Sequence, residues 1–350
     1  MAKTVAFAKD TANVFFHILT QCNLGCRHCY INPRQHGTQK LSLQQIQTWL
    51  EIFIQRSPTA NLIFLGGEPT LHPDLPSAVR AARNLGYASI TIDTNGYLFN
   101  DIIYKVTPDE VDVFSFSLDG PTAEVNDAIR GPGCFAKCTD GILKAKSLGF
   151  GVSLIYTVSS RNLVYLEQMA PLIEKWGVDH FFIQVIGLRG RSALGTEEDA
   201  PLQVTRAQWL DTVPAVARAV AAQGVAVTYP RVYLEPSEPF HCAGRVADNY
   251  FVFPNGRVYR CPLCEDYPLH SLAIVDDRLM TVGPINEADL FKLDIAEGCV
   301  MNKLVQPHNL DYLSDGSPAY KIACCLLKER VEKNCHFERF PASSFEHSRQ

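Results

Sequence analysis

The sequence predicts an α/β protein in which parallel strands and crossover helices close, or nearly close, into a barrel, followed by a smaller cysteine-rich domain. Two observations predict this fold. Between residues 14 and 186, short apolar runs alternate with stretches of helical period in six strand–helix repeats. Beyond about Pro230 the pattern changes to Pro-rich, Cys-rich and hairpin-like segments. We therefore expect two domains, at residues 1–230 and 231–350.

Each element follows from its own residue pattern, taken along the chain. The apolar run from Val14 to Leu19 predicts a first strand, and residues 41–56 place apolar side chains at helical spacing behind Ser42, a suitable N-cap. The same reasoning predicts strands at 61–65, 88–92, 111–118, 152–158 and 181–186, and helices at 73–85, 136–148, 163–176 and 205–223. In such a barrel the carboxyl ends of the strands form one rim, where we expect the functional residues to meet.

Length, composition and charge exclude several classes of protein. The 350 residues are 47% hydrophobic and 20% charged, as in a soluble globular protein, and the formal net charge is −5. No basic tract favours binding to nucleic acid or to an anionic membrane surface, and no apolar run reaches the roughly 18 residues of a membrane span. Residues 1–10 lack the apolar core of a signal peptide, and twelve cysteines favour metal binding in a reducing compartment over disulfides. We therefore expect a cytoplasmic protein.

Three cysteines at the spacing C-x3-C-x2-C, Cys22, Cys26 and Cys29, directly follow the first predicted strand. Soft thiolates this close together suit iron–sulfur or zinc, because one loop can wrap a compact metal centre. A structural zinc site takes four protein ligands, whereas three cysteines on a [4Fe–4S] cluster leave one iron open to a small molecule. The motif alone is also compatible with a redox or zinc loop of an unrelated fold.

With Tyr30 directly after the last cysteine, this motif resembles that of the radical S-adenosylmethionine (radical SAM) superfamily. The resemblance implies a partial (β/α)6 barrel of the TIM type, which agrees with the predicted repeats. It also implies that the open iron binds the amino and carboxylate groups of S-adenosylmethionine beside Tyr30, and that a reductant such as flavodoxin or ferredoxin supplies an electron. That electron would cleave the sulfonium to a 5′-deoxyadenosyl radical, with Cys22, Cys26 and Cys29 as the catalytic cluster ligands.

The run Gly66, Gly67, Glu68 and Pro69 directly follows the second predicted strand. Two glycines allow the backbone to approach a ligand closely, where larger side chains would block it. The run resembles the "GGE" motif of the same superfamily, which implies that these four residues hold the methionyl amino group of S-adenosylmethionine. The alternative is an ordinary turn before a helix.

Polar and apolar residues alternate along the fourth predicted strand, where Ser115, Ser117 and Asp119 are the polar ones. Period-two alternation places them on one face of the strand, and inside a barrel such a face needs polar partners. A ligand with a ribose and a carboxylate would supply them. The resemblance assigns contacts with those two groups to Ser117 and Asp119.

Four further residues are candidates for the cofactor site. Thr94 and Asn95 follow the third predicted strand, although Asn-Gly is first of all a turn dipeptide. Arg130 resembles a loop residue of superfamily members with extra clusters, and its guanidinium would fork onto the carboxylate of S-adenosylmethionine. The alternative is a surface arginine. Gly187 fits an adenine-side loop by the same resemblance, whereas the ten scattered histidines give no comparable signal.

The segment after residue 240 holds seven of the twelve cysteines. Asn255-Gly256 between aromatic runs predicts a β-hairpin, with Cys242 before it, Cys261 at its end and Cys264 three residues on. This resembles the SPASM or twitch extension of radical SAM enzymes, which implies one auxiliary [4Fe–4S] cluster held by Cys242, Cys261 and Cys264. The fourth ligand would be Cys299, Cys324, Cys325, Cys335 or the substrate. A zinc-stabilised small domain is the competing interpretation.

Two classes of function follow. The first is a radical SAM enzyme that cleaves S-adenosylmethionine at a [4Fe–4S] cluster and abstracts hydrogen from a peptide or a small molecule such as a cofactor precursor. The second is a non-enzymatic iron–sulfur or zinc-binding protein with a redox or scaffold role. The second explains the cysteines, but it does not explain the glycines and polar residues of the rim. The first is therefore the favoured interpretation.

Overall fold

The computed structural model describes residues 12–99, 101–194, 202–283 and 285–332. Its main feature is a twelve-stranded sheet in the order β12-β11-β10-β9-β1-β2-β3-β4-β5-β6-β7-β14. Neighbouring strands from β1 to β7 are parallel. The bounds of these strands are β1 Asn13–His17, β2 Asn61–Leu65, β3 Ser89–Thr94, β4 Val113–Ser117, β5 Gly151–Val158, β6 His180–Val185 and β7 Ala226–Pro230. The prediction of parallel strands with crossover helices is confirmed.

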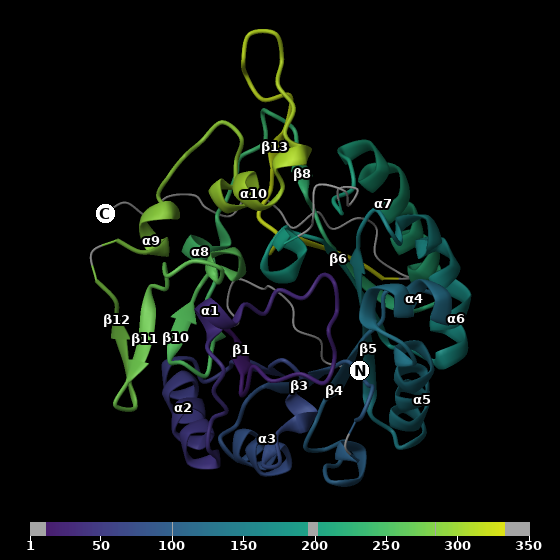
Figure 1. The fold of residues 1–350 in the computed structure, drawn as a ribbon, viewed down its shortest axis with the longest axis vertical. Coiled ribbons are helices and arrows are strands. Elements are labelled where there is room, and N and C mark those ends of the chain that lie inside the picture. Colours follow the sequence, from purple (N-terminus) through teal and green to yellow (C-terminus); the bar gives the residue numbers. More distant parts are fainter. Residues whose placement is uncertain (1–11, 100, 195–201, 284, 333–350) are drawn as a thin grey trace.

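The crossover helices lie on the outer side of the curved sheet, as Figure 1 shows for α2, α3, α5 and α6. Their bounds are α2 Leu43–Arg56, α3 Leu75–Asn84, α4 Ala123–Arg130, α5 Cys134–Ser147, α6 Met169–Trp176 and α7 Arg206–Ala222. In α2, Ser42 caps the helix through a capping box with Gln45, and the apolar face that includes Trp49 and Phe53 is buried. The helix predicted at 163–176 begins as a 3-10 segment, η3, at Leu163–Gln168.

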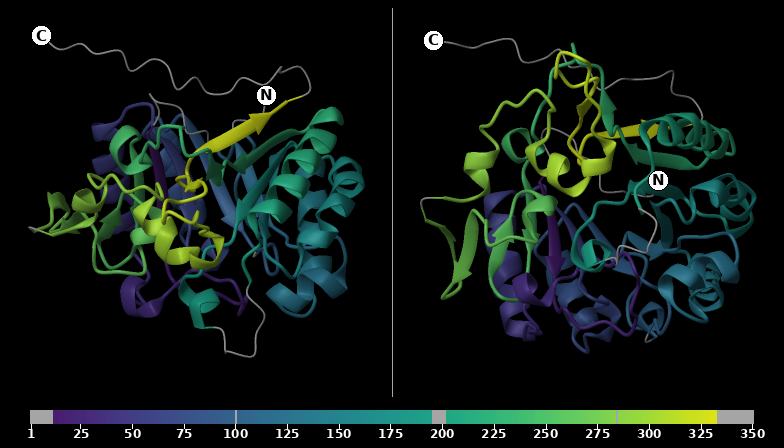
Figure 2. Two further views of the ribbon diagram at one scale, coloured as in Figure 1. Left: turned by 90° about the horizontal axis from the view of Figure 1, so that it is seen from above. Right: turned by 45° about the horizontal axis from the view of Figure 1, so that its top comes forward.

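The segment after residue 230 extends the barrel sheet at both edges. Strand β9 (Asn249–Val252) pairs in parallel with β1, and β10 (Arg257–Tyr259) completes the predicted hairpin, in which Gly256 takes φ 82°. Strands β11 (Leu272–Val275) and β12 (Arg278–Thr281) follow it. At the opposite edge β14 (Lys328–Val331) pairs antiparallel with β7, and it is the long yellow strand in Figure 2. The division into two domains at residue 230 stays a prediction.

Short elements connect these strands. They are α1 Pro33–His36, η1 Pro69–Leu71, η2 Ile102–Tyr104, η4 Gly190–Leu194, β8 Tyr233–Leu234, α8 Ala243–Val246, η5 Pro262–Cys264, α9 Glu287–Leu290, α10 Val300–Val305, η6 Pro307–Asn309 and β13 Lys321–Ile322. Strands β8 and β13 form a separate two-stranded sheet. Within the described ranges, no helix has the length and apolar character needed to cross a membrane.

Buried apolar side chains form two clusters. The larger cluster fills the space between the barrel strands and their helices. The smaller one lies in the C-terminal segment, where Phe251, Phe253, Tyr259 and Phe291 surround buried cysteines. The aromatic side chains of the predicted hairpin therefore pack in one apolar cluster with Cys261 and Cys264, which are buried.

Candidate functional site

One cavity of about 360 Å³ is lined by residues of all seven parallel strands or of the loops after them, and by parts of the C-terminal segment. Most of the rim residues singled out in the sequence line it. They are Cys22, Cys26, Cys29, Tyr30, Gly66, Gly67, Glu68, Pro69, Thr94, Asn95, Ser117, Arg130 and Gly187. Asp119 is fully buried and is not among the lining residues. The sequence pattern thus identifies most of the residues that line the cavity. The partners of each side chain are known only from the structure.

The loop after β1 presents all three cysteine thiols at the cavity. Cys22 Sγ lies 3.4 Å from the backbone N of Leu24 and 3.7 Å from Asn95 Nδ2, both of which are donors. Burial raises the pKa of Cys22 to about 11 and also raises the pKa of Cys26. Because N–H groups directed at sulfur are typical of cysteines that ligate metal, the donor set fits a cluster that would take up the thiolate charge.

The spacing of the thiols also bears on the kind of metal centre. Across the described part of the chain, no three His, Cys, Asp or Glu side chains are grouped as a site for a single metal ion. A four-iron cluster is wider than one ion, and its ligands stand around it at a larger separation. Three thiolates from one short loop are suitable soft ligands for such a cluster.

Gly66 and Gly67 let the loop after β2 pack against the chain that enters the cysteine loop. A Cβ atom added to Gly67 would lie 2.3 Å from the carbonyl O of Gln21, and one added to Gly66 would lie 2.6 Å from that of Leu19. Two backbone hydrogen bonds fasten this contact, from Gly67 N to Leu19 O and from Glu68 N to Gln21 O, both at 3.0 Å. The glycines are therefore required by the protein's own backbone, and a ligand contact at the same place stays a prediction.

Glu68 joins the loops that follow β2 and β3. Its buried carboxylate accepts hydrogen bonds from Thr70 N, Thr70 Oγ1, Thr94 Oγ1 and Asn95 N at 2.7–3.1 Å. Burial raises the pKa of Glu68, and these hydrogen bonds oppose that shift. The side chains of Glu68 and Thr94 thus hold the rim in shape, and the Asn95 side chain extends from it to the cysteine loop, where it donates to Asn23 Oδ1 at 3.0 Å.

Asp119 binds three groups behind the cavity wall. Arg130 Nε lies 2.6 Å and His28 Nε2 3.3 Å from its Oδ2, and the backbone N of Thr157 donates to its Oδ1 at 2.7 Å. Ser115 and Ser117 do line the cavity, while the intervening Phe116 is in the core, as period two predicts. Asp119 therefore pairs with Arg130 within the protein, and a direct contact of either with S-adenosylmethionine stays a prediction.

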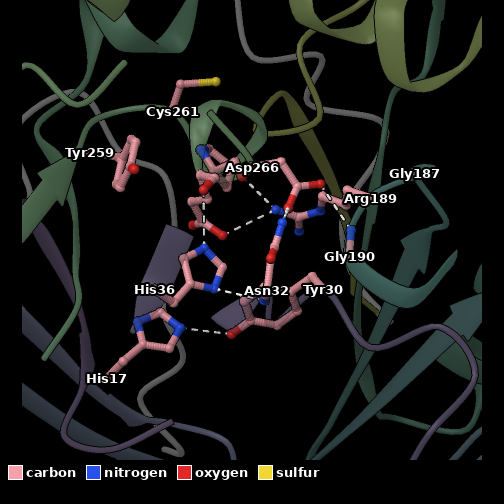
Figure 3. Close-up of polar contacts among 12 residues, drawn as sticks. His17, Tyr30, Asn32, His36, Gly187, Arg189, Gly190, Tyr259, Cys261 and Asp266 are labelled. Carbon is pink, nitrogen blue, oxygen red and sulfur yellow. Dashed lines mark hydrogen bonds and ion pairs between the residues drawn. The ribbon is translucent and has the colours of Figure 1, made fainter. Parts of the chain in front are cut away.

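A polar network joins the end of the cysteine loop to the C-terminal segment (Figure 3). Tyr30 Oη lies 2.7 Å from Nε2 of His17, and the guanidinium of Arg189 stacks 4.9 Å above the Tyr30 ring. Arg189 also donates to the carbonyl of Pro262 and to Glu265 Oε2. His36 Nε2 lies 3.1 Å from the carbonyl O of Glu265. The carboxylate of Asp266 accepts two hydrogen bonds, from Asn32 Nδ2 at 3.2 Å and from Gly190 N at 2.9 Å.

This network contains residues that the sequence did not single out. Burial lowers the pKa of His17 to about 3, so the ring is neutral at ordinary pH. Arg189 lies two residues after Gly187, in a loop that the sequence did indicate, but its partners come from positions more than seventy residues away. No local pattern identifies such partners. Through Tyr30 and Pro262, the network links the chain directly after Cys29 to the chain directly after Cys261.

Six C-terminal cysteines pack in or against the smaller apolar cluster: Cys242, Cys261, Cys264, Cys299, Cys324 and Cys325. Cys242 and Cys299 are the N-cap residues of α8 and α10, and Cys299 Sγ accepts a hydrogen bond from Asn302 N at 3.5 Å. Burial and the neighbouring thiols raise the pKa of Cys299, while a hydrogen bond from Cys325 lowers that of Cys324. The three predicted ligands thus lie in or against the same cluster as three of the four cysteines proposed for the fourth position. The remaining one, Cys335, lies outside the described residues.

Residues 17–173 match the family model of the radical SAM superfamily. Over that segment the chain is similar to this superfamily. Mycofactocin maturase MftC of Mycobacterium ulcerans is 34% identical to it over 197 residues, which are 54% of this chain and 52% of the relative. The AdoMet-dependent heme synthase of Oleidesulfovibrio alaskensis is 28% identical over 182 residues, 51% of this chain and 47% of that protein. The chain thus spans about half the length of the curated relatives it matches.

Solved structures share the fold of this chain. SuiB of Streptococcus suis bound to precursor peptide SuiA superposes with a TM-score of 0.57 at 13% identity, over 85% of this chain and 64% of that one. Native anSMEcpe with bound AdoMet superposes with a TM-score of 0.59 at 13% identity, over 81% of this chain and 84% of that one. The predicted partial TIM-like barrel with a further C-terminal region is confirmed. Both curated relatives named above are named as enzymes.

Asp93, which the sequence places on the rim at the end of the third predicted strand, also lines the cavity. It lies on β3 directly before Thr94. Burial raises its pKa to about 7, a hydrogen bond from Ser115 opposes the shift, and the charge of Glu68 adds to it. Its folded-state pKa is therefore above its unfolded value of about 4, so the protonated form is the one that favours folding.

This shift predicts a pH-dependent stability. The contribution of protonated Asp93 is fully present below pH ~4 and is lost as the pH rises through about 7. We expect Asp93→Asn, which keeps the shape and removes the charge, to raise the free energy of unfolding by about 2 kcal/mol at pH 8 and to leave it unchanged at pH 4. Unfolding of the wild-type protein and the variant in urea, at pH 8 and at pH 4, measures the change in free energy of unfolding at each pH. An equal effect of the substitution at both pH values would contradict the assignment.

Proposed function

We propose that this chain is a radical SAM enzyme in which Cys22, Cys26 and Cys29 hold a [4Fe–4S] cluster whose open iron binds S-adenosylmethionine. One observation carries the proposal: the three thiols and the loop Gly66–Pro69 line the same cavity at the carboxyl ends of adjacent parallel strands. When bound, the cluster supplies the electron that cleaves the sulfonium of S-adenosylmethionine to a 5′-deoxyadenosyl radical, which abstracts hydrogen from the substrate.

The residues of the chain orient the cofactor and shield the reaction. Tyr30 and the loop Gly66–Pro69 border the cavity beside the thiols, Ser117 faces it from β4, and Gly187 faces it from the loop after β6. We assign the methionyl end of S-adenosylmethionine to the Gly66–Pro69 side, its ribose to Ser117 and its adenine to Gly187. Asn95 donates toward the sulfur of Cys22, which favours a ligating thiolate. Arg130, charge-paired with Asp119, keeps the wall beside Cys26 in place.

We further propose that residues 231–350 form a SPASM- or twitch-like domain with one auxiliary [4Fe–4S] cluster on Cys242, Cys261 and Cys264. The buried thiols of Cys299 and Cys324 share the same apolar cluster, which supports one of them as the fourth ligand. Aromatic side chains around these sulfurs exclude water, which protects a cluster from oxidation and hydrolysis. The network from Tyr30 through Arg189 to Pro262 fixes the auxiliary site relative to the first.

The substrate we propose is a peptide or a small-molecule precursor. Support comes from the printed functions of the relatives, a maturase and a heme synthase, and from the fold shared with SuiB, which was solved with a precursor peptide. We place the reaction in the cytoplasm with a flavodoxin or ferredoxin as reductant, and without a nucleic-acid or membrane partner. The net charge of −5 and the high cysteine count support this placement.

The test is anaerobic reconstitution of the chain with iron and sulfide, followed by reduction with dithionite in the presence of S-adenosylmethionine. We expect 5′-deoxyadenosine and methionine in equal amounts, measured by liquid chromatography and mass spectrometry. Omitting dithionite is the control, because the sulfonium needs an electron to break. A fully reconstituted, reduced protein that forms no 5′-deoxyadenosine would rule the enzyme out.

A further inference from the structure

Of the lysine and arginine side chains that line the cavity, one differs from the others in its partners. Arg130 is paired with Asp119, and Arg189 with Glu265. Lys328 also lines the cavity, yet it forms no ion pair with any carboxylate in residues 12–99, 101–194, 202–283 or 285–332. Its ammonium instead lies 4.7 Å from the centre of the Phe182 ring. A lysine that faces a cavity over an aromatic ring and has no carboxylate partner can receive an anionic ligand.

The strands place a second free polar group at the same level of the wall. Lys328 is opposite Pro230 in the β14–β7 pair, and Phe182 is opposite Thr228 in the β6–β7 pair. Gln184, two residues after Phe182, therefore comes level with Pro230 and has the same orientation as Phe182. Gln184, Pro230 and Lys328 all line the cavity, so three neighbouring strands present an amide, an apolar ring and an ammonium side by side.

In the part of the chain that the structure describes, neither polar group has a carboxylate or a hydrogen-bond partner. Among the described residues, the amide of Gln184 has no hydrogen-bond partner, although most other polar residues of this wall have one. His180, for example, lies 3.1 Å from Ser153 Oγ and 2.8 Å from Thr228 Oγ1. An ammonium and an amide that both face a cavity without partners are an incomplete hydrogen-bonding set, which a ligand completes.

We propose that Lys328 and Gln184 bind a carboxylate of the substrate, with the apolar part next to that carboxylate packed against Phe182 and Pro230. The inference rests on the proposed function for its occupant, a radical SAM substrate. One ammonium and one neutral amide match the single charge of a carboxylate, whereas a phosphate dianion would keep an uncompensated charge. The carboxylate belongs either to a peptide C-terminus or to an acid without a peptide group, such as a propionate.

The experiment uses two carboxylate probes and their neutral counterparts on the reconstituted protein with saturating S-adenosylmethionine. The probes are N-acetylphenylalanine and 3-phenylpropionate, and the counterparts are their amides. We expect at least one acid to bind about tenfold more tightly than its amide in isothermal titration, since a charge-assisted hydrogen bond is lost in the amide. Preference for N-acetylphenylalanine supports a peptide C-terminus, and preference for 3-phenylpropionate supports an acid without a peptide group.

Variants assign this preference to its residues. Lys328→Met should remove it, Lys328→Arg should retain most of it, and Gln184→Leu should reduce it about threefold. Lys321→Met is the matched control, because Lys321 donates to the Glu238 carbonyl and does not line the cavity. Equal binding of acids and amides by the wild-type protein, absence of binding by all four probes, or an unchanged preference in Lys328→Met overturns the proposal.

The result is separable from the proposed radical chemistry. A Lys328-dependent preference for acids in a protein that forms no 5′-deoxyadenosine would keep the carboxylate site and remove the proposed enzyme. Formation of 5′-deoxyadenosine without any preference for acids would do the opposite. Lys328→Arg keeps the charge, so a preference for acids that it retains and Lys328→Met loses is assigned to the charge and not to a failure to fold.

Discussion

Replacing Cys22, Cys26 and Cys29 together with alanine is expected to abolish formation of 5′-deoxyadenosine. The reason is that all three thiols border the cavity and are the proposed ligands of the cluster whose open iron binds S-adenosylmethionine. No other cysteine among the described residues lies in the loop after β1, so none there can replace them. Single-turnover assays on reduced protein measure the loss, which should reach the background of the assay without dithionite.

The same triple variant separates the two cysteine sites. If Cys242, Cys261 and Cys264 hold an auxiliary cluster, the reconstituted variant should keep about four irons per chain, the content of one [4Fe–4S] cluster. Cys138→Ala is the matched control, because Cys138 is buried in α5 and does not line the cavity. A triple variant that still forms 5′-deoxyadenosine contradicts the first site, and one that binds no iron, or binds zinc, contradicts the second.

Asp119→Ala is expected to lower the free energy of unfolding by about 3–5 kcal/mol, because it leaves a buried guanidinium without its partner. Arg130 and Asp119 are both buried, their Nε–Oδ2 distance is 2.6 Å, and the Thr157 backbone N loses its acceptor as well. Unfolding in urea, followed by circular dichroism, measures the change. A substitution that only weakens the binding of S-adenosylmethionine, with stability unchanged, would show that Asp119 acts on the ligand.

A double variant tests whether the pair is responsible. Asp119→Ala with Arg130→Met removes both charges. We expect its loss in free energy of unfolding to be smaller, by about 1–3 kcal/mol, than the sum of the losses in the two single variants. Asp119→Asn keeps the acceptor for Thr157 but loses the charge, and it should fall between wild type and Asp119→Ala. Additive effects of the two single substitutions would contradict a direct interaction.

The order of strands and helices in the barrel could be predicted because each element carries its own local pattern. The capping box of Ser42 and the period-two alternation around Ser117 are examples, and both appear in the structure. The pairing of β9 with β1 could not be predicted in this way. It joins Asn13 to Asn249, and contacts so far apart in the chain leave no periodic signal.

The same distinction holds for the candidate site. Motifs located the cysteine loop and Gly66–Pro69 on the cavity, because residues after parallel strands share one rim. They did not reveal that Glu68 braces two loops, nor that Lys328 reaches the cavity from the last described strand. Both depend on burial and on long-range pairing, which change the role of an acidic or basic side chain without altering the sequence around it.

The most direct measurement is the electron paramagnetic resonance spectrum of the reduced, reconstituted protein before and after addition of S-adenosylmethionine. The central claim is that three thiols hold a four-iron cluster with one iron open to that molecule, since Cys22, Cys26 and Cys29 meet at the cavity. The account predicts that S-adenosylmethionine shifts the g values of the cluster in the wild-type protein, and that the triple cysteine variant shows no such shift. A wild-type signal that S-adenosylmethionine leaves unchanged would contradict it.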